Sequence, residues 1–196
     1  MTVNTQVLLK SRPAGKPSID NFKIIETKIP DIQDGQILTR TIYLSLDPYM
    51  RGRMSDARSY AEPVPLGGVM IGGAVGIVEQ SKNDRFEEGD IVVTHTGWQS
   101  HPICDGRGVR KLSPSSAPIS TALGVLGMPG MTSYVGLKHI ALPAEGETLV
   151  VAAATGPVGS TVGQIAKIKG CRTVGIAGGA EKCAYAKSKF GFDNCI

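Results

Sequence analysis

The sequence lacks the features that would place a protein in a membrane or on nucleic acid. No stretch reaches the roughly 18 consecutive apolar residues of a membrane span, and the N-terminus has no signal-peptide core. Aromatic residues make up only 5% of the chain, and its 21 Lys and Arg residues are scattered rather than blocked together. A nucleic-acid surface is therefore not expected. With 41% hydrophobic and 19% charged residues, the composition is that of an ordinary globular protein.

Cysteine is also scarce, and its spacing does not suit a metal site. The chain has no Cys-x-x-Cys pair, and no nearby histidine completes a tetrahedral ligand set. We therefore expect reduced, structural cysteines, as in a cytoplasmic protein. The four cysteines are Cys104, Cys171, Cys183 and Cys195.

The first 125 residues are predicted to be β-rich. Short runs rich in β-branched residues alternate with turns that contain Gly, Pro and Asp, a pattern typical of a small barrel or sandwich. Glycines inside the third run predict bulges or a close approach of backbones. The expected strands are 22–29, 36–44, 73–79 and 90–95.

Residues 126–196 have a different pattern, which predicts alternating strands and helices. A Gly- and Pro-punctuated apolar passage leads into a short helix ending near Leu137, before the first strand. Strands at 148–154 and 172–177 each precede a helix, and a third strand begins near the end of the sequence. This order predicts an α/β fold, the N-terminal half of a Rossmann doubly wound parallel sheet that is apparently truncated.

The turn after the first of these strands carries a nucleotide-binding pattern. Ala154, Gly156 and Gly159 occupy the frame of Gly-x-Gly-x-x-Gly, with alanine in the first place. Gly156 would let the backbone approach a pyrophosphate, and Gly159 would let the helix pack close to the strand. The alternative is a structural turn in an unrelated α/β protein.

The end of the second strand indicates which dinucleotide would bind. An NAD site would place Asp or Glu there, but the sequence continues as Ala177-Gly178-Gly179-Ala180-Glu181-Lys182. Glycines leave room for a 2′-phosphate, and Lys182 could reach it as a point charge. These residues favour NADP. If Lys182 is considered without its neighbours, the alternative interpretation is an ordinary exposed lysine on a helix.

The part of the site where the substrate would react is predicted to lack zinc. A barrel followed by a Rossmann unit also describes zinc alcohol dehydrogenases, but the N-terminal region offers only Cys104, His95 and His101 and no Gly-His-Glu sequence. Without a metal, hydrogen-bond donors must stabilise the developing oxygen charge, which suits reduction of a C=C bond conjugated to a carbonyl. Tyr49 is the best candidate donor, and the alternative is that it only packs against the cofactor.

Three segments, 44–54, 123–132 and 150–182, together resemble the zinc-independent medium-chain dehydrogenase/reductases. Within that superfamily the resemblance is to the prostaglandin reductase and 2-alkenal reductase branch, and most of all to bacterial NADPH-dependent curcumin reductases. It implies a GroES-like catalytic barrel over 1–125, a Rossmann NADP-binding domain over 126–196, and NADPH-dependent reduction of α,β-unsaturated ketones and aldehydes.

The same resemblance implies the residues of the site. Gly156, Pro157, Val158, Gly159 and Ser160 would line the pyrophosphate, while Gly178 and Lys182 would face the 2′-phosphate. Pro48, Tyr49 and Thr132 would lie near the nicotinamide, with Tyr49 also near the substrate carbonyl.

The chain departs from the family in length, because its members continue well past residue 196 to complete the sheet and the substrate pocket. Two alternatives therefore accompany the enone-reductase hypothesis: a truncated, non-catalytic remnant, and a quinone-reductase relative. The resemblance also implies a homodimer, because members of the family often make their dimer contact through the Rossmann sheet.

Overall fold

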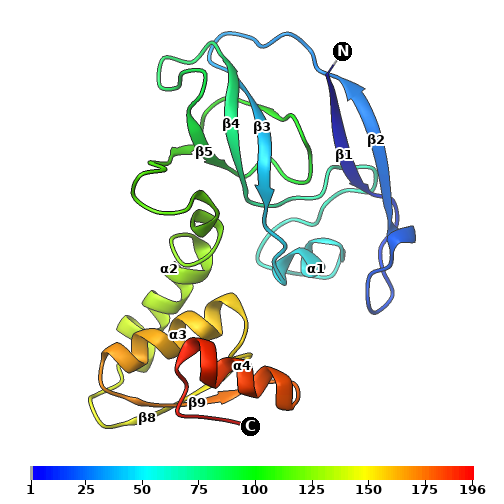
Figure 1. Cartoon of the computed structure of the whole chain (residues 1–196). Coiled ribbons are helices and arrows are strands. Elements are labelled where there is room, and N and C mark those ends of the chain that lie inside the picture. The colour runs from blue at the N-terminus through cyan, green and yellow to red at the C-terminus, as the bar shows by residue number, and fades with distance from the viewer. Residues whose placement is uncertain (1) are drawn as a thin grey trace. The chain divides into compact units, whose positions relative to one another are not determined.

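The computed structural model describes residues 2–196, and the chain divides into two compact units between Ser120 and Thr121 (Figure 1). We call the N-terminal part unit 1 and the C-terminal part unit 2. The division lies close to the expected boundary at residues 125 and 126. The assignment of a catalytic barrel to 1–125 and of a cofactor domain to 126–196 stays a prediction.

Unit 1 is built on a curled antiparallel sheet of order β6-β3-β4-β5-β7. A separate antiparallel pair, β1 with β2, adds a bridge from Gln6 to Gln99 and another from Leu8 to Val69. The four strands expected from the sequence are confirmed as β2 to β5, whereas β1 was not expected, although the β-branched residues Val3, Thr5 and Val7 alternate with Asn4 and Gln6. The strands are β1 (Val3–Leu9), β2 (Phe22–Lys28), β3 (Ile37–Leu44), β4 (Ala74–Ser81), β5 (Ile91–Thr94), β6 (Ile103–Cys104) and β7 (Arg110–Lys111).

Glycine 76 allows β3 and β4 to bend against each other. A Cβ at this position would lie 2.7 Å from the carbonyl oxygen of Arg40 on β3. The register between the two strands shifts twice, between Leu38 and Thr39 and between Thr41 and Tyr43. The bulges and close approach expected from the glycines of this strand are therefore confirmed, and they curl the sheet.

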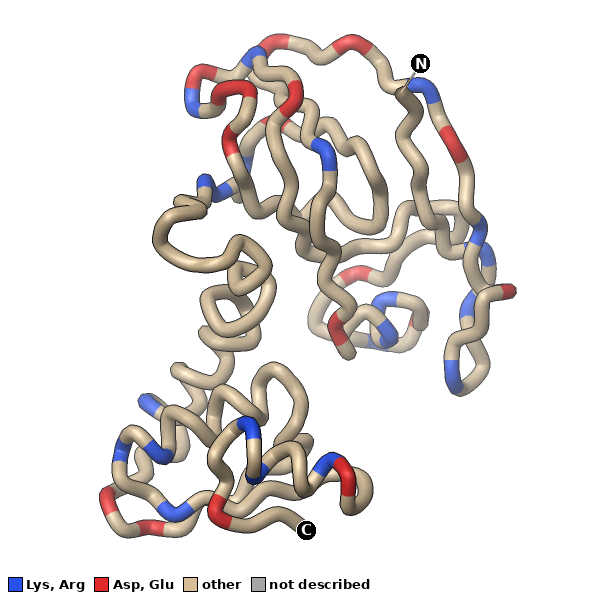
Figure 2. The backbone as a smooth tube through the Cα atoms, in the orientation of Figure 1, with Lys and Arg blue, Asp and Glu red and all other residues tan. Residues whose placement is uncertain are grey.

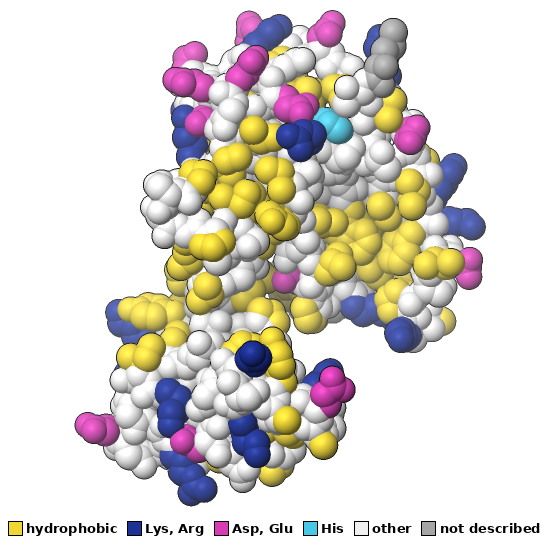
Figure 3. Space-filling model, in the orientation of Figure 1, with side chains coloured by type: hydrophobic (Ala, Val, Ile, Leu, Met, Phe, Trp, Pro, Cys, Tyr) yellow, Lys and Arg dark blue, Asp and Glu magenta, His cyan; other side chains and the backbone are white. Residues whose placement is uncertain are grey.

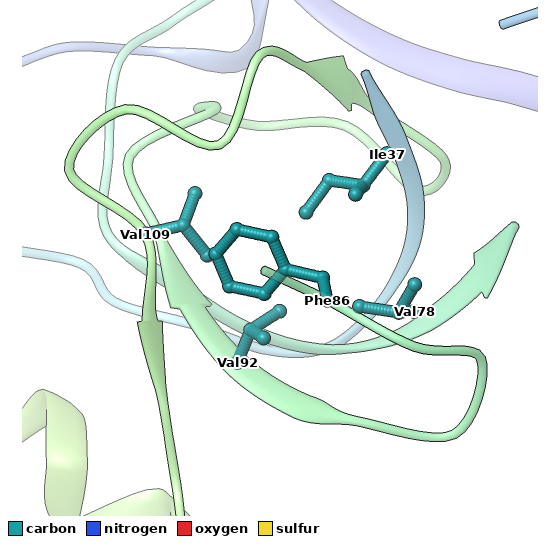
Figure 4. Packing of buried hydrophobic residues seen from close by; sticks show 5 residues of the cluster. All are labelled: Ile37, Val78, Phe86, Val92 and Val109. Atoms are coloured by element: carbon teal, nitrogen blue, oxygen red, sulfur yellow. The ribbon is translucent and has the colours of Figure 1, made fainter. Parts of the chain in front are cut away.

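Two hydrophobic clusters hold unit 1 together. In Figure 4, the ring of Phe86 points into the curled sheet between Val78, Val92 and Val109, with Ile37 opposite. A second cluster joins β1 to the segment after β3 through Leu9, Met54, Val64 and Met70. Unit 1 also has two short helical segments. The first, η1 (Ile19–Asn21), lies directly before β2, and the second, α1 (Tyr49–Arg53), follows β3.

Unit 2 has the βαβαβ order predicted from the sequence. The parallel sheet has the order β10-β9-β8, and α3 and α4 cover one face of it (Figure 1). Its core combines Val151 and Ala154 from the first strand and turn with Ala186 and Phe192. The elements are η2 (Ile119–Leu123), α2 (Met128–Val135), η3 (Gly136–Ala141), β8 (Thr148–Ala152), α3 (Pro157–Ile168), β9 (Arg172–Ile176), α4 (Ala180–Phe190) and β10 (Asn194–Cys195).

The ends of α3 and α4 carry residues that commonly start and stop helices. Pro157 is the first residue of α3, where its missing N–H breaks no helical bond. Gly170, at φ +80°, and Gly191, at φ +72°, adopt the left-handed conformation just after α3 and α4.

Charged residues of the described chain are distributed over both units without a basic stripe (Figure 2). In Figure 3, Lys and Arg side chains stand singly on unit 2, whereas hydrophobic side chains gather on part of unit 1. None of the helices within residues 2–196 is long and apolar enough to cross a membrane.

Candidate functional site

The glycine turn places free backbone amides at the start of α3. Gly156 is the extended N-cap, and its N–H donates to the Ala153 carbonyl at 2.8 Å. Ser160 N–H donates to the Gly156 carbonyl at 2.9 Å, so the amides of Val158 and Gly159 precede the first bond of the helix. A helix N-terminus with such amides favours a bound anion, and a phosphate suits it.

Gly159 keeps α3 against the end of β8. A Cβ at this position would overlap the carbonyl oxygen of Ala153 and would lie 3.0 Å from the Ala154 Cα. These are backbone atoms that cannot rotate away. The close packing of helix and strand expected from this glycine is therefore present.

The remaining residues of the turn differ in exposure. Pro157 and Val158 are exposed, whereas Gly159 and Ser160 are buried. The Ser160 hydroxyl lies 3.5 Å from the Pro157 carbonyl oxygen, inside the first turn of α3. Each predicted pyrophosphate residue thus belongs to one compact turn, and their contact with a cofactor stays a prediction.

Helix α2 is tied to the start of α3 by Ser133. This buried hydroxyl lies 2.8 Å from the Pro129 carbonyl oxygen and 3.0 Å from that of Val158. Thr132, the neighbouring residue, is exposed, and its hydroxyl donates to the Met128 carbonyl. The fold therefore brings the helix that carries Thr132 to the glycine turn.

A cavity of about 460 Å³ joins the glycine turn to α4. Thr155, directly before Gly156, lines it together with Lys182. Lys182 is exposed and forms no ion pair with any of residues 2–196. The other lining residues are Glu181, Ala184, Tyr185 and Ser188.

The sequence did not single out Thr155, Tyr185 or Ser188. Tyr185 and Ser188 follow Lys182 at intervals of three residues, so helical spacing could have placed them on one face of α4. Glu181 is exposed and lines the same cavity as Lys182.

The loop before α4 leaves open space. No atom lies within 4 Å of a Cβ built on Gly178 or Gly179, and Gly179 has φ +94°, a conformation that favours glycine. No acidic side chain stands at the end of β9, so this loop suits a phosphate better than a ribose hydroxyl.

Tyr49 begins α1 in unit 1, directly after the exposed N-cap residue Pro48. Its ring is half-buried, and burial, followed by the nearby Asp47 carboxylate, raises the pKa of its phenol. Tyr49 is therefore a protonated hydrogen-bond donor at neutral pH.

The segment around Tyr49 is fixed by two arginines. Arg51 donates to the carbonyl of Pro13 at 3.1 Å and to that of Gly15 at 2.8 Å. Arg53 is only 2% exposed, and its guanidinium lies 4.4 Å from the centre of the Tyr60 ring and donates to the Ala61 carbonyl. These contacts hold the loop that carries Tyr49.

A mostly apolar cavity of about 380 Å³ lies next to this segment in unit 1. The rings of Trp98 and Phe22 both line it, and they stack with 5.6 Å between ring centres. The other lining residues are Pro17, Leu46, Asp47, Pro48, Met50, Arg51 and Met54. Within residues 2–196, no group of three or more His, Cys, Asp or Glu side chains is arranged to hold a metal ion.

Comparison with curated proteins finds close relatives. The chain is 55% identical over 193 residues to the NADPH-dependent curcumin reductase of Escherichia coli, covering 98% of this chain and 56% of that protein. It is 47% identical over 188 residues to prostaglandin reductase 1 of Rattus norvegicus, covering 94% of this chain and 55% of the relative. The chain thus spans a little over half the length of the curated relatives it matches.

Solved structures agree with the fold. The crystal structure of CurA in complex with NADPH from Vibrio vulnificus is 56% identical, with a TM-score of 0.93 over 98% of this chain and 57% of that one. The Escherichia coli quinone oxidoreductase complexed with NADPH, at 21% identity and a TM-score of 0.74 over 98% of this chain and 58% of that one, shows the shared fold alone. Unit 1 is accordingly the curled sheet of a GroES-like fold, and unit 2 is the beginning of a Rossmann fold.

Residues 5–112 match the family described as the N-terminal domain of oxidoreductase. This match covers more than half of the chain. The chain is therefore a member of this oxidoreductase family, within the medium-chain dehydrogenase/reductases.

Proposed function

We propose that this chain belongs to an enzyme that uses NADPH to reduce the C=C bond of α,β-unsaturated ketones and aldehydes. The observation that carries the proposal is the single cavity shared by the glycine turn, through Thr155, and by Lys182. The names of two similar proteins, an NADPH-dependent curcumin reductase and a prostaglandin reductase, support it. Reduction of quinones has no comparable support, because the similarity to the Escherichia coli quinone oxidoreductase concerns the fold alone.

The residues of unit 2 fit a dinucleotide with a 2′-phosphate. The amides of Val158 and Gly159 at the start of α3 would hold the pyrophosphate, with Gly156, Pro157 and Ser160 forming the turn around them. Lys182, free of any ion pair within the described chain, would hold the 2′-phosphate beside the open space at Gly178. By resemblance, Pro48, Tyr49 and Thr132 would contact the nicotinamide.

When bound, NADPH supplies a hydride to the β-carbon of the conjugated bond. Negative charge then develops on the carbonyl oxygen of the substrate as an enolate forms. The protonated phenol of Tyr49 donates a hydrogen bond to that oxygen and stabilises the charge. Asp47, next in the chain to Pro48 and hydrogen-bonded to the Ser45 hydroxyl at 2.7 Å, helps to keep the phenol protonated.

The proposal includes catalysis without zinc, a cytoplasmic location and a possible homodimer. The lack of a three-residue ligand cluster within residues 2–196 supports the first. The four free thiols agree with the second. The homodimer is supported by the family resemblance alone.

The test is titration of this chain with NADPH and with NADH. Replacing Lys182 by Ala removes one charge-assisted contact and is expected to weaken NADPH binding about tenfold, roughly 1.4 kcal/mol, while NADH affinity stays within twofold. Lys189→Ala, an exposed lysine on the same helix, is the matched control and should leave both affinities unchanged. Equal losses for both nucleotides would contradict the 2′-phosphate assignment, and no NADPH binding by the unaltered chain would favour the non-catalytic alternative.

A further inference from the structure

Two cysteines from separate elements meet at the carboxyl end of β9. Cys195 on β10 pairs in register with Gly175 on β9. A Cβ built on Gly175 would lie 3.1 Å from the Cys195 sulfur, so the missing side chain of this glycine leaves the space that the thiol occupies. Cys195 also packs against the hydrophobic cluster under α3 and α4.

Cys183 approaches the same place from α4. Its N–H donates to the Gly179 carbonyl at 3.1 Å in the first turn of the helix. Its sulfur lies 3.8 Å from the Ala177 carbonyl oxygen. The Ala177 N–H in turn donates to the carbonyl of Ile196, the residue after Cys195, at 2.9 Å.

Both cysteines are half-buried, and their sulfurs lie against the same short segment at the end of β9, Cys195 at Gly175 and Cys183 at the Ala177 carbonyl. Burial, and next the hydrogen bond with the Cys183 thiol, raises the pKa of the Cys195 thiol. The remaining cysteines have no such partner: Cys171 is buried and hydrogen-bonds the Ala144 carbonyl, and Cys104 lies in unit 1.

We propose that Cys183 and Cys195 form a reversible dithiol–disulfide pair, a peroxide-sensitive modification site at the end of β9. This inference does not depend on the proposed reductase activity. It needs only two thiols within reach of one another and an oxidant of the hydroperoxide class.

The chemistry assigns different roles to the two sulfurs. Cys183 lies in the first turn of α4, beside Lys182, and we assign the attack on peroxide to its sulfur. Its thiolate attacks one oxygen of hydrogen peroxide, the O–O bond breaks, hydroxide leaves, and the cysteine becomes a sulfenic acid. The Cys195 sulfur then displaces that oxygen and loses its proton, so that the S–S bond forms and water is released. Two thiols have been oxidised and one peroxide has been reduced.

The proposed disulfide can be tested directly by counting the thiols that remain free after oxidation. The fully reduced chain is treated with a small excess of hydrogen peroxide, alkylated, and measured by intact mass and peptide mapping. Of the four free cysteines, two are expected to escape alkylation, with a peptide linking Cys183 to Cys195, and dithiothreitol should restore all four.

Three variants separate this pair from general oxidation. In Cys183→Ser and in Cys195→Ser no linked peptide forms. In Cys195→Ser the Cys183 sulfenic acid should persist long enough to be trapped by dimedone. Cys104→Ser, the matched half-buried control, should still give the link. The inference is overturned if peroxide leaves all four thiols of the unaltered chain alkylatable, or if the disulfides found join two molecules or involve Cys104 or Cys171.

Discussion

A methyl group added at residue 159 is expected to push α3 away from β8. The Cβ of Gly159→Ala would overlap the Ala153 carbonyl oxygen, and it would come within 2.9 Å of that carbonyl carbon and 3.0 Å of the Ala154 Cα. All three are backbone atoms at the end of a strand, so no rotamer change relieves the contact. The helix or the turn must move as a whole.

The size of the effect follows from two opposing contributions. Overpacking of a well-packed site costs typically 1–3 kcal/mol, and the backbone nature of these contacts favours the upper end. Alanine recovers up to about 1 kcal/mol of helix propensity relative to glycine. A net loss of about 2 kcal/mol in the free energy of unfolding remains, which for a unit of this size lowers Tm by roughly 10 °C.

Far-UV circular dichroism during heating is the assay, because α2, α3 and α4 all lie in unit 2. Gly156→Ala is the matched control in the same turn. Its Cβ would meet only the Ala153 carbonyl oxygen, at 3.3 Å, and its φ of −76° suits alanine. This control should stay within about 0.5 kcal/mol of the unaltered chain. If Gly159→Ala melts at the same temperature as the unaltered chain, or if both variants lose stability equally, the close-packing argument is wrong.

Three other predictions follow from the site and the core. Tyr49→Phe should lower the turnover of a conjugated enone by about 10²–10³ while changing the NADPH dissociation constant less than twofold, and an unchanged turnover would remove Tyr49 from the mechanism. A chelator such as EDTA should leave that turnover unaltered, and loss of activity that zinc restores would refute catalysis without metal. The hydrogen bond from Lys167, and next that from the Thr173 amide, lowers the pKa of Asp193 to about 2. Its contribution to stability is therefore complete above about pH 4 and is lost as the pH falls toward 2, so the urea midpoint of Asp193→Asn should change less over this range than that of the unaltered chain.

The sequence by itself determined the elements of unit 2 and the first of its phosphate-binding features. The proline at the start of α3, the glycines after α3 and α4, and the alternation of apolar runs with amphipathic ones all act over a few residues. Such signals depend on backbone conformation and local hydrogen bonding. For this reason β8 and β9 were found close to their expected bounds, each followed by the expected helix.

Strand β1 shows where local signals were insufficient. Its alternation is weak, and part of its pairing is with residues far along the chain, including the bridge from Gln6 to Gln99. The bulges of β3 likewise arise from its register with β4, which no short segment encodes.

Only the tertiary structure decided which side chains share a surface. Thr155 and Lys182 line one cavity because the parallel pairing of β8 with β9 brings the ends of both strands to the same edge of the sheet. Cys171, Cys183 and Cys195 are equally spaced in the sequence, but only Cys183 and Cys195 lie against the end of β9, Cys195 at Gly175 and Cys183 at the Ala177 carbonyl. Spacing along a chain sets what each segment can become, whereas packing and strand register set which distant groups meet.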